Sequence, residues 1–287
     1  MPLPGLRTIG VCAPAGAVDP ALLANGVGFL RKQGFQVKVT PHAGGKKGYF
    51  SGSADERFAD LEMLWRDPEV DLILAARGGF GCAHLLDRLA QLPPTEKFVA
   101  GFSDLTALLW AIERHHLAVP VALPMAAKFG TYTAETQENA WKALSGIPRQ
   151  VSALTVLKPG DFSGEVLAGN ATVAASLCGT EHFPDCRGRV LVLEDVGEPL
   201  YRLDRVLTQL EMCGAFSDCA GVVFGEFTGT DAPEEELNAL LRRVTRQVKG
   251  GVLANLRYGH EPGDFVSLNY RENITAWGDT IRIGKIC

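Results

Sequence analysis

The first half of the chain alternates short apolar segments with amphipathic ones, and this alternation constrains the fold more than any other feature. Val70–Ala75 is a nearly continuous apolar run, which is typical of a strand buried on both faces of a parallel sheet. Similar strand-like and helix-like segments follow one another from Thr8 to Leu144. Repeated strand–helix units are typical of a doubly wound, mostly parallel sheet with right-handed crossovers. The pattern therefore predicts an α/β N-terminal domain.

Capping and turn residues delimit the expected helices. Asp19-Pro20 supplies an N-cap and a first-turn proline to a helix that ends at Gly34. Ser53 and Glu56 have the spacing of a capping box, which predicts the start of a second helix. The other expected strands are Thr8–Cys12, Phe35–Thr40, Phe98–Phe102 and Val119–Leu123, and the other expected helices are Cys82–Leu89, Leu105–His115 and Thr133–Leu144.

The regular pattern stops between Gly146 and Gly164, where proline and glycine are frequent. We therefore expect an N-terminal domain over residues 1–147, a linker over 148–163 and a smaller mixed β/α C-terminal domain over 164–287. A chain of 287 residues is long enough for two domains. The segments expected in the second half are strands at Val190–Leu193, Gly221–Phe224, Gly251–Leu256, Asp264–Leu268 and Thr280–Ile286, and helices at Tyr201–Met212 and Pro233–Lys249.

Charge and composition exclude several classes of function. Lys and Arg number 28 against 33 Asp and Glu, a net charge of −5, and no long basic run suggests nucleic-acid binding. No apolar stretch is long enough for a membrane span, and no secretory leader is visible, so we expect a cytoplasmic protein. The seven cysteines include no Cys-x-x-Cys pair. This predicts buried reduced thiols, without a disulfide framework or a structural zinc site.

Ser103 is the candidate nucleophile, because reactive groups in parallel sheets gather just after the carboxyl ends of strands. It follows the expected strand Phe98–Phe102 and precedes a helix, as the serine of a nucleophile elbow does. Leu105, however, replaces the second glycine of the G-x-S-x-G pattern. The alternative is that Ser103 only caps the helix, with Asp104 in its first turn.

A glycine-rich loop and a histidine follow two other expected strands. The loop Arg77–Gly81 could present N–H groups to an oxyanion or a phosphate, although it has neither P-loop nor Rossmann spacing. Its glycines could equally serve only a tight turn. His260 begins a loop rich in Gly, Pro and Asp, and the absence of a second ligand nearby favours a general base over a metal ligand. A plain surface histidine is the alternative.

A buried carboxylate could orient that histidine. Glu194 and Asp195 end the apolar strand Arg189–Leu193, and a carboxylate buried there needs a partner such as a histidine N–H. Glu198, Glu226 and Asp264 are rivals, and Glu226 also ends an apolar strand. Periodicity alone does not choose between Glu194 and Glu226.

Several motifs in the same order resemble the LD-carboxypeptidase (murein tetrapeptide carboxypeptidase) family of serine peptidases. The resemblance implies a catalytic triad of Ser103, Glu194 and His260, which favours Glu194 over Glu226. It also implies an oxyanion hole made of backbone N–H groups, here those of Gly79 and Asp104. The segments that carry the resemblance are Ile9–Gly16, Arg77–Gly81, Gly101–Leu108, Leu191–Arg205 and Gly259-His260.

The family resemblance also implies an activity and its partners. Its members hydrolyse the bond before a terminal D-amino acid, as in release of D-alanine from murein tetrapeptides during cell-wall recycling, and they are commonly homodimers without a metal or other cofactor. A terminal carboxylate calls for a fixed cation or a cluster of N–H groups, and Arg77 and Arg202 are the candidate cations. The stretch around Asn170 is a looser version of the family's Gly-Gly-Asn-Leu motif.

Two other functions remain open from the sequence. One is a hydrolase of aminoacyl-nucleotide conjugates like the microcin C immunity proteins, which resemble this family. The other is a non-catalytic protein of the same fold that binds a small ligand and uses Ser103 as a helix cap. Because the implied triad divides between the two expected domains, their relative position could also gate activity.

Overall fold

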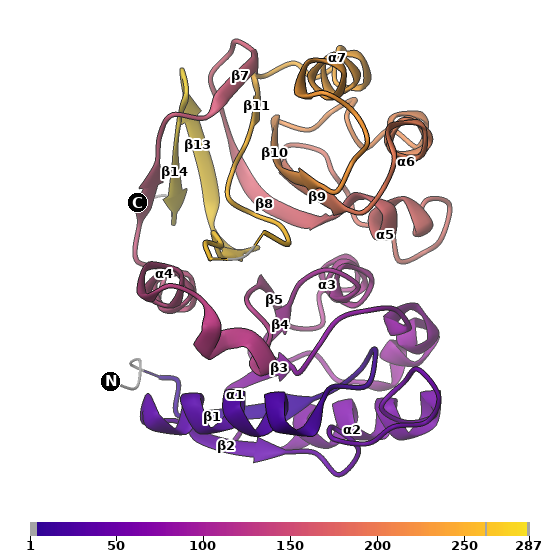
Figure 1. Cartoon of the computed structure of the whole chain (residues 1–287), viewed down its shortest axis with the longest axis vertical. Coiled ribbons are helices and arrows are strands. Elements are labelled where there is room, and N and C mark those ends of the chain that lie inside the picture. Colours follow the sequence, from indigo (N-terminus) through magenta and orange to yellow (C-terminus); the bar gives the residue numbers. More distant parts are fainter. Residues whose placement is uncertain (1–4, 262, 286–287) are drawn as a thin grey trace.

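The computed structural model describes residues 5–261 and 263–285, and it contains two β-sheets with helices packed against them (Figure 1). The first sheet and its helices form the lower half of Figure 1, and the second sheet forms the upper half. No helix within these residues is both long and apolar enough to cross a membrane. Cys287 lies outside the described residues.

The first sheet has the doubly wound parallel arrangement that the sequence predicts. Its strand order is β2-β1-β3-β4-β5, with every pair parallel, and β12 joins β5 in the antiparallel sense. The carboxyl ends of the five parallel strands therefore meet along one edge. The strands are β1 (Thr8–Cys12), β2 (Gln36–Val39), β3 (Leu72–Ala75), β4 (Phe98–Gly101), β5 (Val119–Ala122) and β12 (Leu268–Asn269).

Helices cover both faces of this sheet. In β3, Leu72 and Leu74 pack into one hydrophobic cluster, whereas Ile73 and Ala75 pack into the other. The first cluster includes α1 (Pro20–Lys32), η2 (Ala126–Thr131) and α4 (Ala134–Ser145), and the second includes α2 (Ala54–Arg66), η1 (Cys82–Gln91) and α3 (Leu105–Arg114). The expected helix after Cys82 is a 3₁₀-helix.

The predicted helix caps form as expected. The Asp19 carboxylate accepts hydrogen bonds from the N–H groups of Ala21 and Leu22, at 2.8 and 3.1 Å. Ser53 and Glu56 complete the capping box, since each side chain accepts from the other residue's N–H. Because a helix cap involves only residues close in sequence, the sequence predicts where the first two helices begin.

The second sheet is mixed, with order β6-β14-β13-β8-β9-β10-β11-β7. Strands β8 to β11 are parallel and the others are antiparallel. The elements are β6 (Arg149–Val151), β7 (Thr155–Lys158), β8 (Phe162–Asn170), α5 (Ala171–Ser176), β9 (Val190–Val196), α6 (Leu200–Met212), β10 (Gly221–Thr228), α7 (Glu234–Val244), β11 (Val252–Ala254), β13 (Asn273–Trp277) and β14 (Thr280–Gly284).

Two segments differ from their sequence-based expectations. The segment 148–163, expected as a linker, contains β6 and β7, which are the edge strands of the second sheet. Of the expected strand Asp264–Leu268, only Leu268 enters a strand, β12, and that strand joins the first sheet. Phe265 is buried by packing on the rings of Phe102 and Tyr258. Phe265 is therefore apolar because its ring packs in the core, and its backbone does not pair with another strand.

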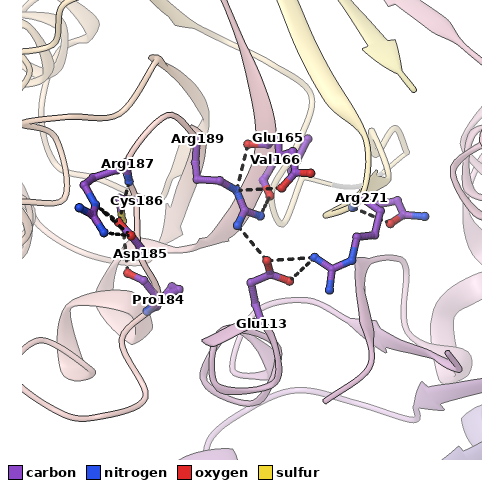
Figure 2. Close-up of polar contacts among 10 residues, drawn as sticks. Glu113, Glu165, Val166, Pro184, Asp185, Cys186, Arg187, Arg189 and Arg271 are labelled. Atoms are coloured by element: carbon purple, nitrogen blue, oxygen red, sulfur yellow. Dashed lines mark hydrogen bonds and ion pairs between the residues drawn. The ribbon is translucent and has the colours of Figure 1, made fainter. Parts of the chain in front are cut away.

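The two sheets share a continuous interface centred on α3. One hydrophobic cluster contains residues of both halves, and the Trp110 indole N–H donates to the Ala168 carbonyl at 2.7 Å. Figure 2 shows the buried Glu113 carboxylate of α3 between Arg189 and Arg271 of the second half, at 2.8 and 3.1 Å. These contacts join the first sheet to the second through α3.

Candidate active site

Ser103 occupies a strained turn between β4 and α3. Its φ is +64°, in the left-handed region that residues other than glycine seldom adopt. The helix-cap alternative does not describe it, because Asp104 is the N-cap residue and no side chain caps this helix. At Gly101, an added Cβ would lie 2.7 Å from Leu105 Cγ. The turn therefore has elbow geometry although Leu105 replaces the second glycine.

The glycine-rich loop after β3 passes directly beside Ser103. A Cβ added to Gly78 would lie 3.4 Å from Ser103 Oγ. Gly79 has φ +111°, and a Cβ there would lie 2.3 Å from the Tyr49 hydroxyl. Within the described part of the chain, the N–H groups of Gly79 and Asp104 donate no hydrogen bond to another protein atom. Both N–H groups thus lack a protein acceptor among the described residues, and Gly79 also lines the pocket that contains Ser103.

Buried polar side chains fix this loop against the serine turn. The Asp104 carboxylate accepts from the Cys82 N–H at 2.9 Å, which joins the two segments. Burial raises the pKa of Asp104, and the hydrogen bond from Cys82 opposes that rise. The buried Arg57 donates to the carbonyls of Pro14 and Gly81. The positions of the loop and of Ser103 are thus set by the same group of contacts.

His260 and Glu194 form a direct pair. The Glu194 Oε2 atom lies 2.9 Å from Nδ1 of His260. Glu194 is fully buried, whereas the His260 side chain is 22% exposed. Burial raises the pKa of Glu194, and the hydrogen bond to His260 opposes the rise. With Nδ1 held by the carboxylate, Nε2 is the ring nitrogen available for proton transfer.

Asn170 links this pair to the helix that follows Ser103. Its amide nitrogen donates to Glu194 at 3.2 Å and to Asp195 at 3.0 Å. Its backbone N–H donates to the Thr106 hydroxyl of α3 at 2.9 Å. The adjacent Gly169 is needed there, because a Cβ would lie 2.5 Å from Thr106 Cγ2. The looser motif around Asn170 therefore keeps an asparagine that orients the buried carboxylate.

Glu226 lies close to this region but is not the partner of His260. It lies against Gly259, where an added Cβ would lie 3.0 Å from Glu226 Oε2. That oxygen is buried without a hydrogen-bond partner among the described residues, and burial raises the pKa of the carboxyl. The sequence pattern does not distinguish Glu194 from Glu226, but in the structure only Glu194 contacts His260 among the described residues.

A pocket of about 560 Å³ brings the two halves of the site together. Ser103, Gly79 and His260 all line it. Most of its other lining residues follow strands of the first sheet, as expected for the carboxyl edge of a parallel sheet, and Val196 at the end of β9 adds a contact from the second sheet.

Two cationic side chains line the same pocket. Arg77 is exposed and donates to the Ala17 carbonyl at 2.6 Å, and Lys128 is exposed with no ion pair within residues 5–261 and 263–285. Arg202, the second expected cation, is absent from the lining of this pocket and lies beside Glu198 at 3.7 Å. Lys128 follows the end of β5 by several residues, so a rule based on strand ends does not predict it.

The chain matches family models and named relatives over most of its length. Residues 9–121 match the LD-carboxypeptidase N-terminal domain, and residues 163–270 match the LD-carboxypeptidase C-terminal domain. A probable murein peptide carboxypeptidase of Bacillus subtilis (strain 168) is 33% identical over 83% of this chain and 77% of its own. The murein tetrapeptide carboxypeptidase of Pseudomonas aeruginosa is 30% identical over 88% of this chain and 86% of its own.

Solved structures share the fold. The crystal structure of muramoyltetrapeptide carboxypeptidase from Oxalobacter formigenes matches with TM-score 0.85 and 26% identity, covering 96% of this chain and 98% of that one. The structure of MccF in complex with glutamyl sulfamoyl guanosine also has TM-score 0.85, at 19% identity, covering 99% of this chain and 98% of that one. At that identity, the second match concerns the fold alone. The chain belongs to the LD-carboxypeptidase family.

Proposed function

We propose that this chain is a serine carboxypeptidase that hydrolyses the peptide bond between an L-centre and the terminal D-alanine of murein tetrapeptides. The observation that carries the proposal is one pocket lined by the strained Ser103, by His260 with its Glu194 partner, and by the cations Arg77 and Lys128. The substrate class follows the names of the relatives from Bacillus subtilis and Pseudomonas aeruginosa.

The geometry supports nucleophilic catalysis. Ser103 Oγ attacks the scissile carbonyl carbon while Nε2 of His260 takes the hydroxyl proton. Glu194 holds the Nδ1–H and stabilises the imidazolium. The N–H groups of Gly79 and Asp104 accommodate the oxyanion of the tetrahedral intermediate. His260 then gives the proton to the leaving amine of D-alanine. In the second stage, His260 takes a proton from water, the water oxygen attacks the acyl carbon, and Ser103 leaves as the alcohol after regaining its proton from His260.

Recognition of a free C-terminus requires positive charge beside the scissile bond. Arg77 and Lys128 line the pocket with Ser103, so they are our candidates for binding the terminal carboxylate. Arg202 remains a candidate only if the substrate extends beyond this pocket, since its side chain is directed to Glu198. The exposed position of Lys128 leaves it available to an incoming anion.

The direct test compares matched peptides. The purified protein is incubated with a murein tetrapeptide that ends in D-alanine, with its epimer that ends in L-alanine, and with the D-form amidated at its C-terminus. We expect rapid release of D-alanine from the first peptide alone. The Ser103→Ala variant should release none above background. Equal release from the L-epimer would contradict the stereochemical assignment, and equal cleavage of the amide would contradict carboxylate recognition.

The competing function is hydrolysis of an aminoacyl-nucleotide conjugate, and the same assay decides it. The relatives from Bacillus subtilis and Pseudomonas aeruginosa are named for murein peptides, whereas the match to MccF, at 19% identity, concerns the fold alone. A synthetic aminoacyl sulfamoyl nucleoside should therefore be cleaved far more slowly than the tetrapeptide. Faster cleavage of the nucleoside would favour the competing function.

Two further expectations can be tested directly: that the protein works in the cytoplasm, which was drawn from the sequence, and that it is a homodimer, which the family resemblance implies. Light scattering of the purified chain measures its mass directly, and a mass equal to one chain would contradict the second expectation. Fractionation of the source cells tests the first expectation.

A further inference from the structure

Cys178 and Cys213 face each other at the ends of two packed helices. Cys178 follows α5, and Cys213 is the C-cap residue of α6. Their sulfur atoms are 2.9 Å apart. The Gln209 side chain of α6 donates to the Ala175 carbonyl of α5 at 2.8 Å, which fixes the two helices relative to each other. The short separation of the sulfurs is therefore a property of the helix packing.

This pair is accessible, unlike the other described cysteines. Cys213 is exposed and Cys178 is partly exposed, which corrects the expectation that the thiols are buried. Both line an open surface pocket of about 540 Å³, separate from the pocket that contains Ser103. The cysteines that are buried are Cys12, Cys82, Cys186 and Cys219.

The two thiols have different chemical roles. The Cys178 thiol donates a hydrogen bond to the sulfur of Cys213, and this lowers the pKa of Cys213 to about 7. The same contact raises the pKa of Cys178 above its usual range. The thiolate is the nucleophilic form of cysteine, so Cys213 is the better nucleophile of the two. Cys178 stays a thiol next to it.

We propose that Cys178 and Cys213 form a reversible intramolecular disulfide when the protein meets a peroxide. The Cys213 thiolate attacks one peroxide oxygen, the O–O bond breaks, and the other oxygen leaves as hydroxide, which takes up a proton to give water. Cys178 then attacks the sulfenic sulfur and expels its oxygen as a second water. The two sulfurs are oxidised and the peroxide is reduced. A dithiol reductant reverses the change.

Little movement is needed to form the bond. The sulfurs must approach from 2.9 Å to about 2.05 Å. The bond would close a loop of 35 residues and tie α5 to α6, the helices that follow the strands carrying Asn170 and Glu194. We expect the oxidised protein to melt about 5 °C or more above the reduced one. The proposal does not depend on the catalytic assignment.

The test uses the full chain in its reduced form. The protein is treated with hydrogen peroxide, its remaining thiols are blocked with an alkylating agent, and an unreduced digest is analysed by mass spectrometry. We expect a Cys178–Cys213 linked peptide, with the loss of two hydrogens, that disappears after dithiothreitol. The exposed Cys213→Ser change and the Cys178→Ser change should each abolish it, whereas Cys186→Ser should not.

Two results would overturn the proposal. One is oxidation of Cys213 to sulfinic acid without any linked peptide, since it would mean that Cys178 does not resolve the sulfenic acid. The other is a link only between two copies of the chain, which electrophoresis without reductant would reveal. Circular dichroism of both serine variants checks that they are folded, so that loss of the link reports on chemistry.

Discussion

The two sheets position their parts of the candidate site by different means. In the first sheet, Ser103 is placed by backbone geometry, through a positive φ in a short turn between β4 and α3. In the second half, Glu194 on β9 and His260, in the loop between β11 and β12, are held together by side-chain hydrogen bonds in a polar network that includes Asn170. The first arrangement stores local strain, and the second depends on groups far apart in the sequence.

This difference suggests how each part responds to substitution. A strained turn should lose strain, and retain its fold, when glycine replaces the strained residue. A buried network should be sensitive to any change that leaves a polar group unpaired. The two halves also meet at Glu113, so a third kind of substitution can weaken their contact without altering either part of the site.

The largest effect is expected at the strained turn. Ser103→Gly should reduce turnover of the tetrapeptide by about 10⁴-fold to 10⁶-fold, because it removes the nucleophile. It should nevertheless be more stable than Ser103→Ala by about 1 kcal/mol, since glycine adopts a positive φ without strain. Kinetics and urea unfolding measure the two quantities. A Ser103→Gly variant less stable than Ser103→Ala would mean that the turn is not strained.

The buried network should show the next largest effect. Glu194→Gln keeps the shape of the side chain but removes the charge that orients His260, so turnover should fall by about 10⁴-fold. The matched control is Glu226→Gln, which alters a carboxylate without a contact to His260 among the described residues and should change turnover only a few-fold. If Glu226→Gln reduced turnover more than Glu194→Gln did, Glu226 would be the partner of His260.

The cations of the pocket should affect substrate binding more than chemistry. Lys128→Ala and Arg77→Ala should each raise KM about 10-fold to 100-fold with a smaller change in kcat, because each removes one charged contact to the terminal carboxylate. Lys142→Ala, on the surface of α4 and paired with Glu138, is the control. A rise in KM for Arg202→Ala, without one for Lys128→Ala, would restore the expectation drawn from the sequence.

The contact between the halves should matter for stability. Glu113→Gln leaves Arg189 and Arg271 without their buried negative partner, so the free energy of unfolding should fall by about 3 kcal/mol. Glu138→Gln, which breaks an exposed pair on α4, should cost less than about 0.5 kcal/mol. Denaturant unfolding measures both. If the arrangement of the halves is fixed by their shared core, the folded Glu113→Gln protein should keep most of its activity.

The smallest effect is a pH dependence of stability. Burial raises the folded-state pKa of Glu194, so the folded protein keeps this proton to a higher pH than the unfolded chain. Stability should therefore fall as pH rises from the ordinary carboxyl pKa toward the raised folded value. Glu194→Gln removes this contribution. Unfolding at several pH values should show the wild-type stability declining relative to that variant, and a rise instead would mean that the carboxylate is stabilised by its surroundings.

Local patterns predicted the first half of the chain well. The caps at Asp19 and Ser53 and the apolar run at β3 depend on neighbours in sequence, so their outcome is close to the expectation. The edge strands β6 and β7 are short, and their pairing depends on β14 and β11, more than 90 residues away in the chain. Sequence periodicity carries no information on such partners.

The sequence by itself determined the chemical inventory of the site and its order along the chain. Ser103, the glycine loop, Glu194 and His260 each follow or end an apolar segment of the sequence, and this rule is local, although Glu194 lies within β9 in the structure. Only the tertiary structure decided which carboxylate contacts His260, that Asn170 supports it, and that Lys128, not Arg202, lines the pocket with Ser103. The physical reason is that contacts between side chains depend on how the strands of two sheets pack in space, which spacing along one chain does not specify.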